Sequence, residues 1–142
     1  MILIDITENN ISNYKLFEKC YNDNLSKYLS RIYPDSNTVI KWCYINVGDE
    51  NIGSVWLEAV DENTVKLGIF ITEEKYRNRN YGTKAIESML CFAKYKGYKN
   101  VILNVRTSNI RAYSLYQKLG FIEINRFTKE NGIDVISMEL EL

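Results

Sequence analysis

The stretch VKLGIFITEEKYRNRNYGTKAIESMLCFAKYKGYKNVILNV (residues 65–105) contains two strand patterns separated by a polar loop and a helix pattern. Apolar residues occupy alternate positions of 65–72, which is the period of a strand. Over 80–97 the apolar spacing becomes that of a helix ending at a glycine, and 101–106 is a second apolar run. A strand, a helix and a strand in this order form a right-handed crossover, so we expect the two strands to be parallel neighbours.

The rest of the chain completes the order β-α-α-β-β-β-α-β-α-β-β. A helical pattern covers 11–32 with an interruption near 22–24, and a later helix lies between Asn109 as N-cap and Gly120 just after its end. The remaining strand patterns cover 1–7, 38–47, 52–60, 121–128 and 133–141. These elements predict one α/β (α+β) domain over 1–142, with a mixed, mostly antiparallel central sheet of about seven strands flanked by about four helices.

The composition limits the classes of function. The 18 Lys and Arg residues balance 18 Asp and Glu residues, which argues against a dedicated nucleic-acid binder. Histidine is absent and the three cysteines are scattered, so a metal site is not expected and reduced thiols are the simpler interpretation. No signal peptide and no apolar run of the ~20 residues that a membrane span needs is present. We therefore expect a cytoplasmic protein without a membrane partner.

The loop before the predicted helix, residues 77–83, has two interpretations. A helix N-terminus offers free N–H groups, and asparagine and glycine let a phosphate approach them closely. Arg77 and Arg79 add cationic donors, while Asn78 and Asn80 tolerate a left-handed backbone. The loop is then a pyrophosphate cradle. The alternative is a solvated polar loop with Gly82 in the first helical turn.

Two segments of the chain resemble the GNAT superfamily of N-acetyltransferases. RNRNYGT (77–83), which follows LGIFIT, is similar to the family's R-x-x-[G/N]-x-G-T acyl-CoA-binding motif, with asparagine at position 80 where glycine is usual. VILNVRTSNIRAYSLYQKLGF (101–121) is similar to the family's next segment, closest to the branch that acetylates the N-terminal alanine of a ribosomal protein. The resemblance implies direct acetyl transfer from acetyl-CoA to an amine in a ternary complex, without a metal.

The resemblance also implies roles for particular residues. Asn109 would hydrogen-bond the pantetheine, or would serve only as an N-cap. Tyr116 would be the general acid that protonates the leaving thiolate, or would be a core residue on the apolar stripe of its helix. The pantetheine arm would pair with the backbone of Phe70, Ile71 and Thr72. The pyrophosphate would bind Arg77, Asn78, Arg79, Asn80, Tyr81, Gly82 and Thr83.

The general base of the family is missing. The two positions at which related branches carry a glutamate hold Lys66 and Asn104. Other carboxylates near the predicted site, which are more typical of solvated turns and strand edges, are Glu58, Asp61, Glu73 and Glu74. Deprotonating a lysine-like amine at pH 7 costs about 4.6 kcal/mol, against about 1.4 kcal/mol for an α-amine. A site without a strong base therefore favours an α-amine, or a water chain to solvent.

The acceptor side is expected to be lined by residues 20–38 and by the hairpin near 128–134. Its aromatic residues, which form either a wall of that site or part of the core, are Tyr21, Tyr28, Tyr33 and Trp42. Because the family base is absent, a non-catalytic acyl-CoA-binding module is a competing function. A third is an anion or nucleic-acid binder using Arg77, Arg79, Arg106 and Arg111, which the zero net charge disfavours. Exposed strands near the C-terminus leave a homodimer open.

Overall fold

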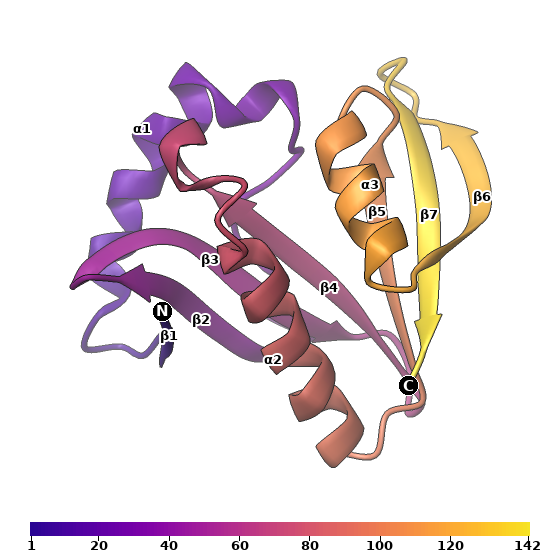
Figure 1. Cartoon of the computed structure of the whole chain (residues 1–142), viewed down its shortest axis with the longest axis horizontal. Helices are drawn as coiled ribbons and strands as arrows, with labels where there is room; N and C mark the ends of the chain where they lie inside the picture. The colour runs from indigo at the N-terminus through magenta and orange to yellow at the C-terminus, as the bar shows by residue number, and fades with distance from the viewer.

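A single seven-stranded sheet forms the centre of the computed structural model, which describes residues 1–142 (Figure 1). The spatial order is β1-β2-β3-β4-β5-β7-β6. Every neighbouring pair is antiparallel except β4 and β5, which are parallel and joined by the predicted crossover. The strands are β1 (Ile2–Asp5), β2 (Val39–Val47), β3 (Glu50–Ala59), β4 (Thr64–Ile71), β5 (Asn100–Arg106), β6 (Ile122–Thr128) and β7 (Asp134–Glu141). The predicted mixed, mostly antiparallel sheet is confirmed.

Three α-helices are present: α1 (Lys15–Asp23), α2 (Tyr81–Tyr95) and α3 (Ile110–Lys118), with short 3-10 turns at Ile11–Tyr14, Leu25–Lys27 and Glu74–Tyr76. About four helices were predicted, and the structure has three α-helices with three 3-10 turns; the helical pattern predicted to reach residue 32 is wrong, because α1 ends at Asp23. α1 ends where Asn24 leaves the helical conformation at φ −146°; Leu25 is then buried from a 3-10 turn and Ile32 from the loop after it. The Tyr14 hydroxyl holds that loop by donating to the Ile32 carbonyl. None of the helices has the length and apolar character to cross a membrane.

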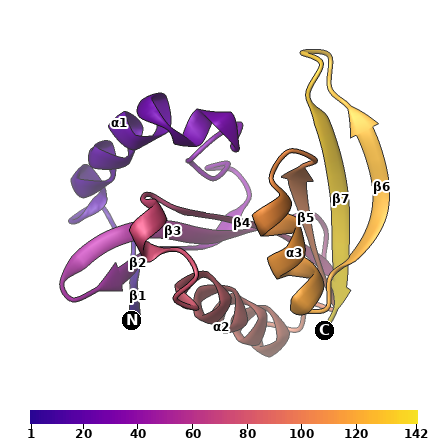
Figure 2. The same cartoon turned by 45° about the horizontal axis from the view of Figure 1, so that its top comes forward.

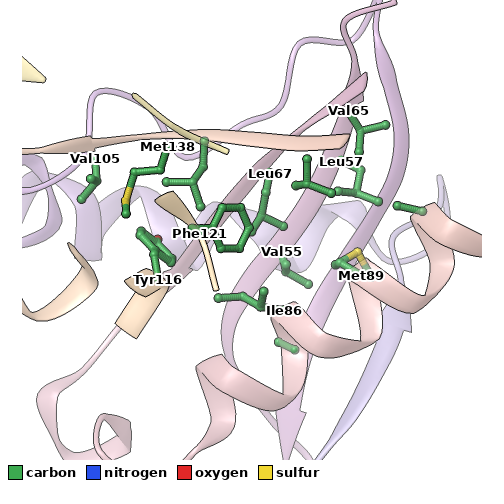
Figure 3. Packing of buried hydrophobic residues seen from close by; sticks show 14 of the residues in the cluster. Val55, Leu57, Val65, Leu67, Ile86, Met89, Val105, Tyr116, Phe121 and Met138 are labelled. Carbon is green, nitrogen blue, oxygen red and sulfur yellow. The ribbon is translucent and has the colours of Figure 1, made fainter. Parts of the chain in front are cut away.

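The helices cover the two faces of the sheet, α1 on one and α2 on the other (Figure 2). The α2 face carries the larger apolar cluster, in which Ile86 and Met89 of α2 lie beside Val55 and Leu57 of the sheet, and Met138 lies beside Tyr116 (Figure 3). The α1 face carries a smaller, mostly aromatic cluster of Tyr14, Phe17, Leu25, Ile32, Tyr44, Trp56 and Phe70. Since each face is packed separately, strand residues alternate between the two clusters.

The two central strands pair over only a short length. Thr64–Lys66 of β4 lie beside 100–102 of β5, and beyond that point the strands diverge (Figure 1). β4 continues along β3 to Ile71, and β5 continues along β7 to Arg106. The diverging strands therefore present backbone groups to each other with no strand between them, and this gap holds the site described next.

Candidate active site

The loop before α2 presents an uninterrupted row of free backbone donors. Asn78 and Asn80 adopt left-handed conformations, with φ of 61° and 65°, as their residue type allows. After Arg77, whose N–H donates to the Glu74 carbonyl at 2.9 Å, the next N–H group with an acceptor in the chain is that of Lys84, which donates to the Asn80 carbonyl at 3.0 Å. The N–H groups of residues 78–83 have no acceptor within the chain. Successive unpaired N–H groups at a helix N-terminus form an anion-binding concavity.

A cavity of about 310 Å³ extends from this loop into the gap between the strands. Gly82 and Arg77 line it, and the Arg77 guanidinium donates to the Ile71 carbonyl at 3.4 Å. A Cβ at Gly82 would lie 3.6 Å from Ile71 and 3.7 Å from Leu115, which is ordinary contact. The fold therefore does not require glycine at this position. The absence of a side chain at Gly82 instead leaves more room in the cavity for a bound molecule. Arg79 is exposed and does not line the cavity.

The backbone of β4 faces the gap through alternate residues. The polar groups of Thr72 point toward β3 and away from the gap, because both its N–H and its hydroxyl donate to the Ile52 carbonyl, at 2.8 and 3.1 Å. Phe70, two residues earlier, is likewise paired toward β3, at Ser54. Ile71 and Ile69 therefore turn their polar groups toward the gap. Ile71 is one of the predicted residues; Ile69 was not predicted, since its role depends on which strand edge stays unpaired.

Tyr116 stands where two cavities meet. It projects from α3 beside Phe121 and is only 8% exposed (Figure 3). Its side chain borders both the 310 Å³ cavity and a second cavity of about 140 Å³, and its hydroxyl makes no hydrogen bond within the chain. Burial raises the pKa of Tyr116 to about 12. The phenol therefore stays protonated at neutral pH and offers an uncommitted donor to the shared wall.

Asn109 also borders both cavities. Its Oδ1 accepts from the Ala112 N–H at 3.3 Å, so the predicted N-cap role is confirmed. The cap uses only the oxygen of the amide, and the Nδ2 group has no partner in the chain. The two functions considered for Asn109 are therefore compatible.

The smaller cavity lies on the side where the acceptor was expected. Tyr28, Ser30 and Arg31 come from the loop after α1, and Lys129 comes from the C-terminal hairpin, so both predicted segments contribute. Of the other aromatic residues considered, Tyr33 and Trp42 pack around Tyr14 in the aromatic cluster.

Glu58 is the only carboxylate that borders the acceptor-side cavity. Its oxygens accept from the Arg31 guanidinium at 2.6 and 2.7 Å, and one also accepts from the Asp35 N–H at 2.5 Å. Burial alone would raise the pKa of Glu58, but these hydrogen bonds outweigh it and hold the pKa below its ordinary value. A carboxylate that is so fully occupied is a poor general base.

The other carboxylates considered are not placed as bases either. Asp61 accepts from the backbone of its own turn, and Glu73 pairs with Lys75 at 3.4 Å on the surface. Glu74 borders the larger cavity 4.0 Å from Arg111. Asn104, at one of the family's base positions, accepts from the Ser137 hydroxyl at 2.7 Å.

The cysteines stand apart from both cavities. Cys43 is buried in β2, where burial raises its pKa to about 12, and Cys20 and Cys91 also line neither cavity. A thiol held protonated is a weak nucleophile. No side chain here is arranged to form a covalent intermediate.

Comparison with known proteins agrees with the geometry. Residues 6–121 match the family model described as acetyltransferase (GNAT) family, whereas a search of curated proteins gives no match. Among solved structures, the ribosomal L7/L12 alpha-N-protein acetyltransferase RimL in complex with coenzyme A superposes with a TM-score of 0.83 at 11% identity, covering 99% of this chain and 93% of that one.

Two further solved structures cover the same length. A GNAT family acetyltransferase from Elizabethkingia anophelis with acetyl-CoA bound has a TM-score of 0.73 and 20% identity, with 99% and 97% of the two chains covered. A spermidine N-acetyltransferase chimera from Vibrio cholerae and hSSAT has a TM-score of 0.77 and 15% identity, with 99% and 96% covered. Identities this low show the shared fold, while the family match extends over most of the sequence. The chain belongs to the acetyltransferase (GNAT) family.

Proposed function

We propose that this protein transfers an acetyl group from acetyl-CoA directly to a primary amine, either of a small molecule or at the α-amine of a peptide, in a ternary complex. The observation that carries the proposal is the row of free N–H groups at 78–83, which opens into the cavity bordered by Tyr116. A diphosphate fits the row, and a pantetheine arm fits the unpaired edge of β4. Two of the solved relatives contain coenzyme A or acetyl-CoA.

The thioester of acetyl-CoA supplies the activated acetyl group. The amine nitrogen forms a bond to the acetyl carbon, the carbon–sulfur bond breaks, the nitrogen loses a proton and the sulfur gains one. The free N–H of Ile71 or Ile69 is positioned to donate to the carbonyl oxygen as charge builds on it. Because Glu58, the only carboxylate bordering the acceptor-side cavity, is already occupied by Arg31 and the Asp35 N–H, the proton from nitrogen leaves through water in that cavity.

Tyr116 is the donor to the departing sulfur in this proposal. With the phenol pKa at about 12 and a thiol near 8.5, complete proton transfer is uphill by about 5 kcal/mol. Tyr116 therefore acts mainly by hydrogen-bonding the thiolate as it forms and keeps its own proton, and the sulfur takes up its proton from solvent. Such a donor contributes about 10²-fold or more to the rate.

The test measures coenzyme A binding by titration calorimetry and thiol release from acetyl-CoA with a panel of amines. We expect Gly82→Glu to abolish binding by placing a carboxylate beside the diphosphate, while Ser88→Glu, on the exposed side of the same helix, binds normally. We expect Tyr116→Phe to bind coenzyme A and to lose about 10²-fold in turnover. Tyr113→Phe, on the same helix but bonded to Glu123, is its matched control.

A non-catalytic acyl-CoA-binding module is the second candidate. The occupied state of Glu58 and the absence of a carboxylate at Lys66 and Asn104 favour it. Saturable coenzyme A binding without thiol release from any amine would support the module over the transferase. If wild-type protein gives no binding heat and Gly82→Glu behaves like the parent, both candidates fail.

A further inference from the structure

The acceptor-side cavity is lined with cations. Arg31, Lys66, Arg106 and Lys129 border it, and Glu58 is its only acidic residue. Glu58 is only 4% exposed and is already neutralised by its two hydrogen bonds from Arg31. The remaining cations therefore face the cavity without a carboxylate partner.

The partners of these cations are few and neutral. Lys66 makes no hydrogen bond or ion pair, although it lies directly opposite Glu58 on β3. Lys129 donates only to the Ser30 hydroxyl, at 3.1 Å. Arg106 donates to the Ser26 carbonyl at 3.0 Å and to the Ser30 hydroxyl at 3.4 Å. Burial lowers the pKa of Lys66, and repulsion from Arg31 and Lys129 lowers it further while Glu58 partly offsets this. A bound anion would relieve that repulsion.

Two buried donors at the same cavity have no partner. The buried side-chain nitrogen and oxygen atoms of the protein that lack a hydrogen bond are Trp56 Nε1 and Arg106 Nε. Trp56 is 4% exposed, and its indole lies over Gly68, which borders the cavity with it. Both nitrogens donate and neither accepts. Unpaired buried donors are costly, so a site that holds two of them beside cations is suited to a molecule rich in acceptor oxygens.

From this geometry we infer that the acceptor is a small amine that also carries a carboxylate or phosphate group. The anionic group binds Trp56 Nε1, Arg106 Nε and the Lys66 ammonium group. The amino group then lies at the wall shared with the larger cavity, beside Tyr116. This inference rests on the proposed function, and it disfavours polycationic acceptors, which the same cations would repel.

The activity test uses acceptors matched in pairs that differ in the anionic group: glycine against glycinamide, and O-phosphoethanolamine against ethanolamine, with spermidine as the polycation. We expect kcat/KM to be about ten-fold or more higher for the anionic member of at least one pair. A difference within the glycine pair indicates that the site binds a carboxylate, and a difference within the phosphoethanolamine pair indicates that it binds a phosphate. The neutral members have the more acidic ammonium groups, so amine pKa alone predicts the opposite order. Lys66→Met should remove the preference, while Lys99→Met, at an exposed residue just before β5 that borders neither cavity, should retain it.

A second measurement does not depend on acetyl transfer. The chain has two tryptophans, so its indole N–H groups give two nuclear magnetic resonance signals, which Trp42→Phe assigns. With coenzyme A present, we expect glycine or O-phosphoethanolamine to shift the Trp56 signal, and Lys66→Met to weaken that binding about ten-fold. The neutral partners should not shift it.

The two readouts separate the inference from the proposed function. A Trp56 shift without turnover of any amine supports the anion site and removes the transferase. Efficient turnover of spermidine or of the neutral amines, unchanged in Lys66→Met and without a Trp56 shift, keeps the transferase and overturns the inference.

Discussion

The Arg31–Glu58 pair is a contact between residues far apart in the sequence that ties the loop after α1 to the sheet. Glu58 is buried, whereas the Arg31 side chain is 43% exposed, so the carboxylate depends on the pair more than the guanidinium does. Removing the arginine leaves a buried carboxylate with one backbone donor, from Asp35. Losing Arg31 is therefore costly, because it leaves the buried Glu58 carboxylate without its cation.

We expect Arg31→Met to lower the free energy of unfolding at pH 7 by about 2–3 kcal/mol. In the parent, the lowered pKa of Glu58 contributes stability above about pH 4.3, and this is lost as the pH falls through the folded-state pKa. Without Arg31, burial raises that pKa, so the difference between variant and parent is largest near neutrality. Urea denaturation at pH 7 and pH 4 measures it; a pH-independent difference would contradict the ion-pair explanation.

The indole of Trp56 on β3 occupies the space that a side chain at Gly68 on β4 would need. The two residues are directly paired, and a Cβ at Gly68 would overlap the indole ring. We expect Gly68→Ala to destabilise the protein by about 1–3 kcal/mol through overpacking. In a Trp56→Ala background that cost should largely vanish, because the ring that causes it is gone. A double-mutant cycle by chemical denaturation gives the coupling, and additive effects would rule out the clash.

At the N-terminus of α2, the residue type alone predicts the backbone conformation. Asn78 and Asn80 were predicted to tolerate a left-handed backbone, and both adopt it. We expect Asn80→Ala to cost about 1 kcal/mol in unfolding free energy, since alanine has no local compensation for positive φ. Glycine adopts positive φ without a steric penalty, so the free energy of unfolding of Asn80→Gly should match that of the parent to within about a few tenths of a kcal/mol. Thermal denaturation of the two variants side by side tests this, and equal stabilities would contradict it.

The strands and their order along the chain could be read from the sequence because alternation and turn residues are local signals, whereas the place of β7 between β5 and β6 was not predicted. The extent of α1 could not be read in this way: residues 25–32 were predicted to be helical, yet Leu25 is buried from a 3-10 turn and Ile32 from a loop that is held by the distant Tyr14 hydroxyl. The same limit applies to the site. Ile69 and the partner of Glu58 follow from strand register and from a loop contact, which no short window of sequence contains.

Taken as a whole, the molecule is two half-sheets, β1 to β4 and β5 to β7, joined along a short run of paired residues. A ligand that occupies the gap contacts both halves and should stabilise their association. At a coenzyme A concentration of 100 times the Kd, linkage adds about 2.7 kcal/mol, or about 9 °C in Tm for a chain of this length. Differential scanning calorimetry measures the shift.

Hydrogen exchange locates the origin of that stabilisation. The free N–H groups of Ile69 and Ile71, and those of the loop before α2, should exchange rapidly without ligand and slowly with coenzyme A. The Phe70 and Thr72 amides, already paired with β3, should change little. If protection appears only at sites remote from the gap, the proposed position of coenzyme A is wrong.

The short paired run of β4 and β5 is also the point about which a change in the angle between the two half-sheets would displace the tip of β4. At ~3.3 Å per residue, the tip of β4 at Ile71 lies about 17 Å beyond the last paired residue, so a rotation of about 3° about that point moves the tip by about 1 Å. A displacement of that size in a reacting group is enough to cost about 10²-fold in rate. Val65 and Val101 are paired and fully buried at this junction, so we expect their packing to set the angle at which the two half-sheets diverge.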